Sequence, residues 1–360
     1  MTDLSELTTM RVGGPAESLL RPTTELELVT STIEVWESGE PWLILGGGSN
    51  VVVADDGFDG TVIRVATEGI QVLGVDGARV RIRVQAGHSW DALVAHAVAQ
   101  GWAGIEALSG IPGTVGAAPI QNIGAYGQEV ASTLVAVDFL DFLEGEVQRI
   151  PASELALDYR TSVFKQGRGG LVVAIELELE VADRGRVDYP QLATALAVKV
   201  GDRLPLIEVR RAVLALRASK GMVLDPNDQD SVSCGSFFTN PIVGENFARG
   251  LPAGAPQWPM APEAPDVAVP LGEEPAPPAP SSDRVKLSAA WLIEQAGIER
   301  GFALPGSRAA ISSKHTLAIT NRGGATAAEV AELARYVRLM VQGRFGVDLQ
   351  PEPVAIGVQL

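Results

Sequence analysis

The part of the sequence best suited to bind a ligand is a glycine-rich stretch at residues 101–127. It contains seven glycines and a single charged residue, Glu106, where average usage would give about two glycines. A regular helix or strand is disfavoured there, because each internal glycine costs roughly 0.5–1 kcal/mol. Successive bare backbone N–H groups form a concave nest for an anion, typically a phosphate. Gln121, Asn122 and Tyr126 add polar and aromatic groups beside it. The alternative interpretation is a surface loop built of turns.

A second candidate nest, GGGSN at residues 46–50, separates two of three predicted strands at residues 41–45, 51–55 and 61–65. It is not a dinucleotide fingerprint, since Val51 stands where the third glycine or alanine belongs and a strand-like run follows where a helix would be needed. Taken alone, the pattern is equally typical of a glycine turn in a hairpin.

Composition limits the classes of function. The chain has 360 residues, 46% of them apolar, and 28 Lys+Arg against 44 Asp+Glu give a net charge of −16. An acidic chain is a poor nucleic-acid binder, although a phosphorylated small ligand needs only a few local cations. The one cysteine, Cys234, excludes an internal disulfide. The three histidines are scattered, so we expect no metal site. We see no signal peptide and no apolar run of about 20 residues, and therefore expect a cytoplasmic protein with no membrane partner.

Periodicity predicts the elements around these stretches. Residues 80–86 alternate as a strand, and Ser89 is expected to cap a helix that begins at Trp90. Two strands are predicted at residues 134–141 and 146–150, and a third at residues 173–181, whose glutamates we expect on a solvated face without a catalytic role. An amphipathic helix is expected over residues 206–219.

The last third of the chain contains an unusual segment. Residues 251–282 hold ten of the 23 prolines and predict a loop or partly extended excursion. A short helix is expected at residues 288–296. Thr326 and Glu329 form a capping box for a helix that should end at Gly343, with Val330, Leu333, Val337 and Met340 inward. The prolines of the last ten residues place a final strand near a sheet edge.

Six strings carry a resemblance that covers nearly the whole chain: IPGTVGAAPIQNIGAYG, LILGGGSN, DYRTSVF, CGSFFTNP, WLIEQAG and LQPE. Together they resemble the bacterial UDP-N-acetylenolpyruvoylglucosamine reductases. The resemblance implies an α+β protein with a vanillyl-alcohol-oxidase (PCMH-type) FAD-binding fold in two lobes and an α+β substrate-binding domain. It implies lobes at residues 1–65 and 66–217, a substrate domain at 218–345 that carries the Pro/Ala-rich loop, and a strand at 346–360 that returns to the FAD lobes.

The reaction that the resemblance implies begins with reduction of non-covalently bound FAD by NADPH. Hydride from the flavin then goes to the terminal carbon of an enolpyruvyl ether on a UDP-sugar, and a proton goes to the adjacent carbon. The product, UDP-N-acetylmuramate, is a peptidoglycan precursor. In this family, NADPH and substrate resemble alternating occupants of one site.

Three residues match the family's catalytic positions. Arg160 resembles the arginine that binds the substrate carboxylate and stabilises the developing charge. Ser236 resembles the proton donor to carbon, and Glu352 the glutamate on the opposite side of the enolate. Without the resemblance, Arg160 could equally well be a surface partner of Asp158. Ser236 would then be interpreted as a strand-edge hydroxyl, and Glu352 as a solvated carboxylate.

The binding residues follow from the same strings. For FAD they are the residues of both nests, namely Gly46, Gly47, Gly48, Ser49, Asn50, Ser109, Gly110, Ile111, Pro112, Gly113, Gly116, Ala117, Asn122, Gly124, Ala125 and Tyr126. For the substrate they are Tyr189, Lys220, Asn240 and Gln295, of which Lys220 resembles a lysine that contacts the nucleotide phosphates and Tyr189 a tyrosine that closes over the diphosphate. Lys220 also reads as a cation at a helix C-terminus.

Two other functions stay open. One is another FAD-dependent oxidoreductase of the same fold, such as an alcohol or sugar oxidase that needs no NADPH. The other is a binding protein that keeps the ligand pocket without catalysis, which the presence of all three catalytic-type residues disfavours.

Thr8-Thr9 stands where the family often has Asn-Thr, a change that affects only a turn. Cys234 lacks a His–Asp or His–Asn set and is expected to be an inert buried thiol. We expect a monomer.

Overall fold

A computed structural model describes residues 2–260 and 283–360 of the chain. Its N-terminal part is a small parallel sheet in the order β1-β4-β2, formed by β1 (Ala16–Leu20), β4 (Phe58–Arg64) and β2 (Trp42–Leu45). Helix α1 (Glu25–Ser38) connects β1 to β2 and begins at a capping box between Thr24 and Glu27. The three strands predicted over residues 41–65 are confirmed, but β2 and β4 run parallel and β3 (Val51–Val53) lies outside this sheet. The glycine turn at residues 46–50 is therefore not a hairpin.

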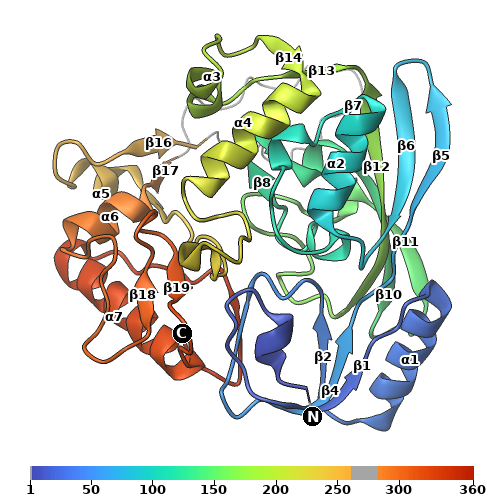
Figure 1. Cartoon of the computed structure of the whole chain (residues 1–360), viewed down its shortest axis with the longest axis horizontal. Helices are drawn as coiled ribbons and strands as arrows, with labels where there is room; N and C mark the ends of the chain where they lie inside the picture. The colour runs from blue at the N-terminus through green and yellow to red at the C-terminus, as the bar shows by residue number, and fades with distance from the viewer. Residues whose placement is uncertain (1, 261–282) are drawn as a thin grey trace, which may run out of the picture.

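A larger antiparallel sheet follows in the sequence and runs along the right side of the view in Figure 1. Its order is β11-β10-β12-β6-β5, and β7 (Trp102–Ala103) pairs with the end of β12. The strands are β5 (Ile70–Asp76), β6 (Arg79–Gln85), β10 (Leu134–Asp141), β11 (Val147–Pro151) and β12 (Gly170–Val181). Helix α2 (Trp90–Gln100) begins at the predicted Ser89 cap and buries Trp90, Leu93, Val94 and Ala97 in the same core.

One expectation for β12 is wrong. Glu180 is exposed, but Glu176 is only 4% exposed. The neighbouring strands explain the difference, because Arg149 on β11 and Arg81 on β6 reach across the sheet to this carboxylate. A buried carboxylate is tolerated when it is paired in this way. The acidic face of β12 is thus partly covered by an ion-pair network.

Helix α4 (Leu206–Ala218) confirms the predicted amphipathic helix and buries Val209 and Val213. With the short helix α3 (Pro190–Ala195) it forms a separate small core, beside the two-stranded ribbon of β13 (Arg184–Arg186) and β14 (Arg203–Pro205). Tyr126, from the glycine-rich stretch, packs against this core. The arrangement brings the C-terminal end of α4 next to that stretch.

The C-terminal part, drawn from yellow to red in Figure 1, has its own core. Its elements are β15 (Ile242–Gly244), α5 (Glu245–Arg249), β16 (Gln257–Pro259), β17 (Arg284–Leu287), α6 (Ala289–Gln295), β18 (Ala309–Ile311), β19 (Ile319–Asn321) and α7 (Ala327–Phe345). The predicted helix at residues 288–296 and the Thr326 capping box are confirmed. The Pro/Ala-rich segment is not only a loop, since β16 pairs with β17, and its residues 261–282 lie outside the described part of the chain.

The end of α7 differs from the prediction. The helix continues through Gly343 and ends at Gly346, whose φ of 71° provides the left-handed cap. Val341, four residues after Val337, is fully buried, whereas Met340 is 36% exposed. The 3.6-residue period therefore continues past the glycine, whose cost of about 1 kcal/mol in a helix is outweighed by tertiary packing.

The last strand, β20 (Val354–Ile356), pairs in parallel with β3. Glu352 N–H donates to the Phe237 carbonyl at 2.9 Å, and Val354 N–H donates to the Asn50 carbonyl at 2.9 Å. The tail is thereby tied both to the second glycine turn and to the segment that contains Ser236. Residues about 120 to 300 positions apart in the sequence meet at this point.

Candidate active site

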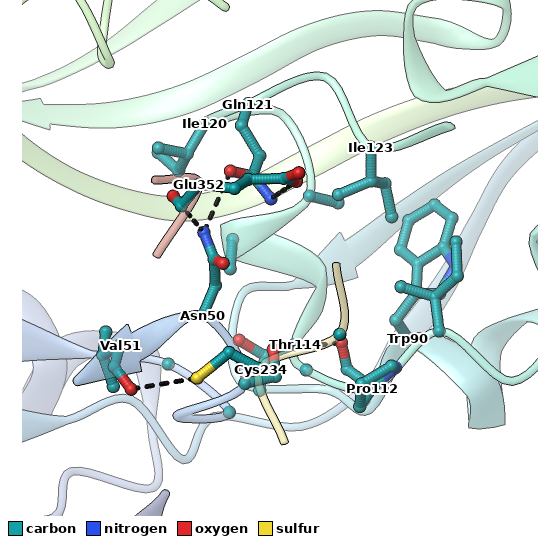
Figure 2. Close-up of a pocket in the computed structure, with 18 of the residues that line it drawn as sticks. Asn50, Val51, Trp90, Pro112, Thr114, Ile120, Gln121, Ile123, Cys234 and Glu352 are labelled. Atoms are coloured by element: carbon teal, nitrogen blue, oxygen red, sulfur yellow. Dashed lines mark hydrogen bonds between the residues drawn. The ribbon is translucent and has the colours of Figure 1, made fainter. Parts of the chain in front are cut away.

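A cavity of about 500 Å³ lies where the three parts of the chain meet (Figure 2). One wall is backbone from the two glycine segments, and the other carries charged side chains. The lining residues that matter here are Gly46, Gly47, Gly48, Ser49, Asn50, Ile111, Pro112, Gly113, Ala117, Gln121, Gly124, Arg160, Lys165, Arg217, Ser236 and Glu352.

The two glycine segments pack directly on each other. A Cβ on Gly47 would lie 2.4 Å from the Cα of Gly113, so no larger residue fits there without a shift of the backbone. Ser49 Oγ donates to the Pro112 carbonyl at 3.1 Å and locks the contact. Within the described part of the chain, the backbone N–H groups of Gly47, Gly48 and Ser49 donate to no group. Free backbone donors beside a cavity fit a phosphate or pyrophosphate.

Arg160 is held in place by the glycine-rich stretch. Its guanidinium donates to the carbonyls of Asn122 at 3.3 Å and Gly124 at 3.0 Å, and its φ of 56° is a strained value for this residue type. Its Nε lies 3.3 Å from Glu352 Oε1. Among the described residues, the structure shows no ion pair between Arg160 and Asp158, so the surface-pair interpretation is wrong.

Glu352 is enclosed by donors and cations. Gln121 Nε2 donates to its Oε1 at 3.2 Å, and Asn50 Nδ2 donates both to Gln121 Oε1 at 3.0 Å and to the Glu352 carbonyl at 3.2 Å (Figure 2). Burial raises the pKa of the Glu352 carboxyl, while the charges of Arg160 and Lys165 pull it down. The effect of burial is larger than that of the two cations, so the pKa of this carboxyl is raised.

Ser236 lines the same cavity between two buried neighbours, Cys234 and Phe237. In the described part of the chain its hydroxyl makes no hydrogen bond, which leaves it available to a ligand. The Cys234 thiol donates to the Val51 carbonyl at 3.3 Å (Figure 2), and burial raises its pKa to about 12. A thiol with that pKa is not a nucleophile at neutral pH.

Several residues predicted for the cofactor do not reach the cavity wall, namely Ser109, Gly110, Gly116, Asn122, Ala125 and Tyr126. Asn122 instead supports the loop, since its amide contacts Glu129, the Asp158 carbonyl and the Ala131 N–H. A Cβ on Gly116 would lie 2.6 Å from that of Ala86, which explains this glycine by packing. Ser109 Oγ donates to the Glu106 carbonyl.

None of the four residues predicted for the substrate lines the cavity. Lys220 Nζ lies 5.7 Å from the ring centroid of Tyr126, which packs edge-on against Tyr189. Asn240 Oδ1 accepts the Ala289 N–H at 3.0 Å, and Gln295 is exposed on α6. The structure thus brings Lys220 and Tyr189 together through Tyr126, and Asn240 contacts Tyr159, the neighbour of Arg160.

Sequence reasoning missed two cations that line the cavity, Lys165 and Arg217. Arg217 stands in an amphipathic pattern whose polar positions are normally solvated, and nothing in the local sequence marks it as buried. Lys165 directly follows the string that contains Arg160. Its closeness to Arg160 in the sequence could have identified Lys165 as a candidate, because side chains so near each other in the chain can line the same site.

Comparison with known protein families indicates which class of protein has this fold and site. The FAD binding domain model matches residues 16–151, and the UDP-N-acetylenolpyruvoylglucosamine reductase C-terminal domain model matches residues 225–356. The cavity lies between these two regions and has free backbone donors for an FAD pyrophosphate. The protein is therefore an FAD-binding oxidoreductase, and the predicted α+β fold with an FAD-binding domain is confirmed.

The similar proteins narrow the class further. The chain is 59% identical to the UDP-N-acetylenolpyruvoylglucosamine reductase of Leifsonia xyli, with both chains covered completely. It is 49% identical to that of Nocardia farcinica over 99% of this chain and 89% of the relative. The crystal structure of the Thermus caldophilus reductase matches with a TM-score of 0.64 at 28% identity, over 99% of this chain and 97% of that one. The chain belongs to the UDP-N-acetylenolpyruvoylglucosamine reductase family.

No helix in the described ranges is both long and apolar enough to cross a membrane.

Proposed function

We propose that this protein reduces UDP-N-acetylglucosamine enolpyruvate to UDP-N-acetylmuramate for peptidoglycan synthesis, with non-covalent FAD and with NADPH as reductant. The observation that carries the proposal is the convergence of Arg160, Ser236 and Glu352 on one cavity whose other wall is the glycine nest. We further propose that it works as a cytoplasmic monomer. The domain limits proposed are 1–65, 66–217 and 218–345, with the tail at 346–360 completing the site.

When bound, FAD supplies the hydride transfer from NADPH to the enolpyruvyl terminal carbon. The free N–H groups of Gly47, Gly48 and Ser49 hold the pyrophosphate of FAD. Arg160, already oriented by two backbone carbonyls, binds the substrate carboxylate and stabilises the charge that develops beside it. Its contact with Glu352 keeps the two side chains on the same part of the cavity wall.

The proton that completes the reaction comes from Ser236 Oγ. As hydride adds to the terminal carbon, the double bond becomes a single bond and the adjacent carbon takes the serine proton. A serine is a weak acid and can donate its proton only when it is held close to a strongly basic carbon. The next residue, Phe237, is buried and holds the backbone at Ser236 in place. Lys220, Tyr189, Asn240 and Gln295 bind the substrate in this proposal, with Lys220 and Tyr189 at its phosphates.

The test separates the two half-reactions. The bound flavin is reduced with NADPH under anaerobic conditions, UDP-N-acetylglucosamine enolpyruvate is added, and flavin absorbance is followed. We expect prompt reoxidation in the wild type. In Ser236→Ala, reduction stays intact and reoxidation is lost by about 10²–10⁴-fold. Reduced wild-type flavin that ignores this substrate would exclude the proposed reaction and favour an oxidase of the same fold.

A further inference from the structure

The segment between Lys220 and Ser236 connects two residues of the proposed site, and its own polar groups fold it. Ser231 Oγ donates to the Asp228 carbonyl at 2.8 Å. The Asp228 carboxylate accepts the Asp230 N–H at 3.1 Å and so caps a single turn of 3-10 helix. The backbone around Asp230 is therefore fixed by bonds within the segment itself.

Both carboxylates of this segment bind the loop between β18 and β19, residues 312–316. Asp230 Oδ1 accepts the Ser313 N–H at 2.8 Å, and Asp230 Oδ2 accepts the Ser313 hydroxyl at 2.6 Å. Lys314 Nζ donates to Asp228 Oδ2 at 2.9 Å. Two neighbouring residues of one loop are thus held by two carboxylates of the other segment, and Asp230 makes the closer, two-point contact.

Asp230 also touches the turn that carries Lys220. Gly221 is buried with a φ of 68°, and a Cβ there would lie 2.7 Å from that of Asp230. The N–H groups of Lys220 and Gly221 donate to the Arg217 and Ala218 carbonyls, each at 3.0 Å, at the end of α4. The turn is held by α4 on one side and packs on Asp230 on the other. A shift of Asp230 would therefore move the backbone at Lys220.

The side chain of Lys220 reaches away from Asp230 toward another part of the molecule. Its Nζ donates to Gln191 on α3 at 3.1 Å and lies 5.7 Å from the ring centroid of Tyr126. A lysine is a point charge on a flexible stem, so the place of its ammonium depends on how its backbone is held. The backbone support comes from the C-terminal part of the chain through Asp230.

The loop at residues 312–316 lies close to the ammonium as well. Burial lowers the pKa of the His315 imidazole to about 4, and the positive charge of Lys220 contributes to the shift. The segment returns to the C-terminal part a few residues later, where Ser233 pairs with Thr320 of β19 (Figure 1). Asp230 thus lies between the loop and the Lys220 turn.

We propose that Asp230 is a positioning residue for Lys220. Its carboxylate, held by Ser313, supports the turn at Gly221 and so directs the ammonium toward the phosphates of the UDP-sugar. Holding a binding group in place before the ligand arrives lowers the cost of ordering it. The inference rests on the assignment of Lys220 to these phosphates in the proposed function. It goes beyond that function, because Asp230 does not line the cavity.

The experiment is a double-mutant cycle with UDP as the probe, titrated into the oxidised holoprotein and followed by calorimetry. Asp230→Asn and Ser313→Ala weaken the contact from its two sides. Each is made in the wild type and in Lys220→Met. Asp56→Asn removes an exposed carboxylate elsewhere in the chain and controls for net charge. The KM and kcat for the enolpyruvyl substrate are measured for the same proteins.

We expect Asp230→Asn and Ser313→Ala to weaken UDP binding by about three- to tenfold, the range for residues coupled by contact. In Lys220→Met neither change should weaken it further, because Asp230 acts through that side chain. KM should rise while kcat stays within about twofold, as expected when uniform binding is lost. Asp56→Asn should match the wild type.

Equal weakening with and without Lys220 would overturn the proposal, since Asp230 would then support only the fold. Unchanged UDP affinity in both single variants would overturn it too. A loss confined to kcat would assign the carboxylate to the Ser236 end of the segment. Ser313 is exposed, so Ser313→Ala keeps the test decisive if Asp230→Asn does not fold. A wild-type holoprotein that does not bind UDP would contradict the proposed substrate itself, whereas additive losses in a protein that binds UDP contradict only this inference.

Discussion

The cavity has two walls that are built in different ways. The glycine wall, residues 46–50 and 111–114 with Ala117, uses backbone groups that are close together in the sequence. The charged wall uses side chains from distant positions, with Arg160 after β11, Arg217 on α4 and Glu352 before β20. The first wall depends on close backbone contact and the second on the tertiary fold. A substitution in the glycine wall should therefore have different effects on cofactor content and activity from a substitution in the charged wall.

The comparison also shows how the walls depend on each other. Arg160 is oriented by carbonyls of the glycine-rich stretch, and Glu352 by the amides of Gln121 and Asn50, one from each glycine segment. Backbone geometry in the glycine wall thus fixes the charged groups opposite. A defect in the glycine wall should disturb both walls, whereas a defect in the charged wall should stay local.

The largest effect is expected from Gly47→Ala. The added Cβ would lie 2.4 Å from the Cα of Gly113, which forces the two loops apart and costs about 1–3 kcal/mol by overpacking. We expect the purified protein to lose its flavin, measured by visible absorbance, and all activity with it. The melting temperature should also fall.

Gly343→Ala is the matched control. A Cβ there meets nothing within 4 Å, and the glycine lies inside α7, where alanine stabilises a helix by about 1 kcal/mol. This variant should keep its flavin and melt slightly higher. Normal flavin content in Gly47→Ala would show that the close contact of the two loops does not form the cofactor site.

The difference between the walls also explains what the sequence could reveal. The Ser89 cap and the period of α4 are local signals, and each predicted its helix correctly. The glycine runs are local signals as well, but only some of the residues predicted there for the cofactor line the cavity. The ion-pair cover over Glu176 and the burial of Arg217 arise from neighbours far away in the chain, which periodicity does not contain. Ser236 and Glu352 carry no local signal of chemistry at all and were singled out only through the family resemblance.

A smaller and more local effect is expected from Arg160→Met in the charged wall. Loss of the guanidinium should slow reoxidation of the flavin by the enolpyruvyl substrate about 10²–10³-fold, the usual loss for one charge-stabilising donor. Flavin content and the rate of reduction by NADPH should stay near wild type. Stopped-flow absorbance measures the two rates separately.

Arg249→Met removes an arginine that forms a surface pair with Glu245 at 2.5 Å, away from the cavity-lining residues, and it should change neither rate. Equal slowing of both half-reactions in Arg160→Met would contradict the division between the walls. It would mean that Arg160 supports the bound cofactor as much as the substrate.

The smallest effect is expected from Lys165→Met. Burial lowers the pKa of the Lys165 ammonium, and its positive charge in turn lowers the pKa of the Glu352 carboxyl. Without that charge the carboxylate is less stable, so Glu352 binds its proton at a higher pH. The limb of the pH profile of kcat/KM that Glu352 controls should move to higher pH by about one unit or less, since Arg160 remains. Lys199→Met, at an exposed position, should leave the profile unchanged.

The direction of this shift tests the role of the charged wall more sharply than its size. Methionine keeps most of the side-chain volume, so the cavity stays filled while one positive charge is lost. A profile that moves to lower pH would require the controlling group to be something other than a carboxyl beside a cation. A profile that does not move would mean that Glu352 takes no part in the titration, and the charged wall would then act through Arg160 and Ser236.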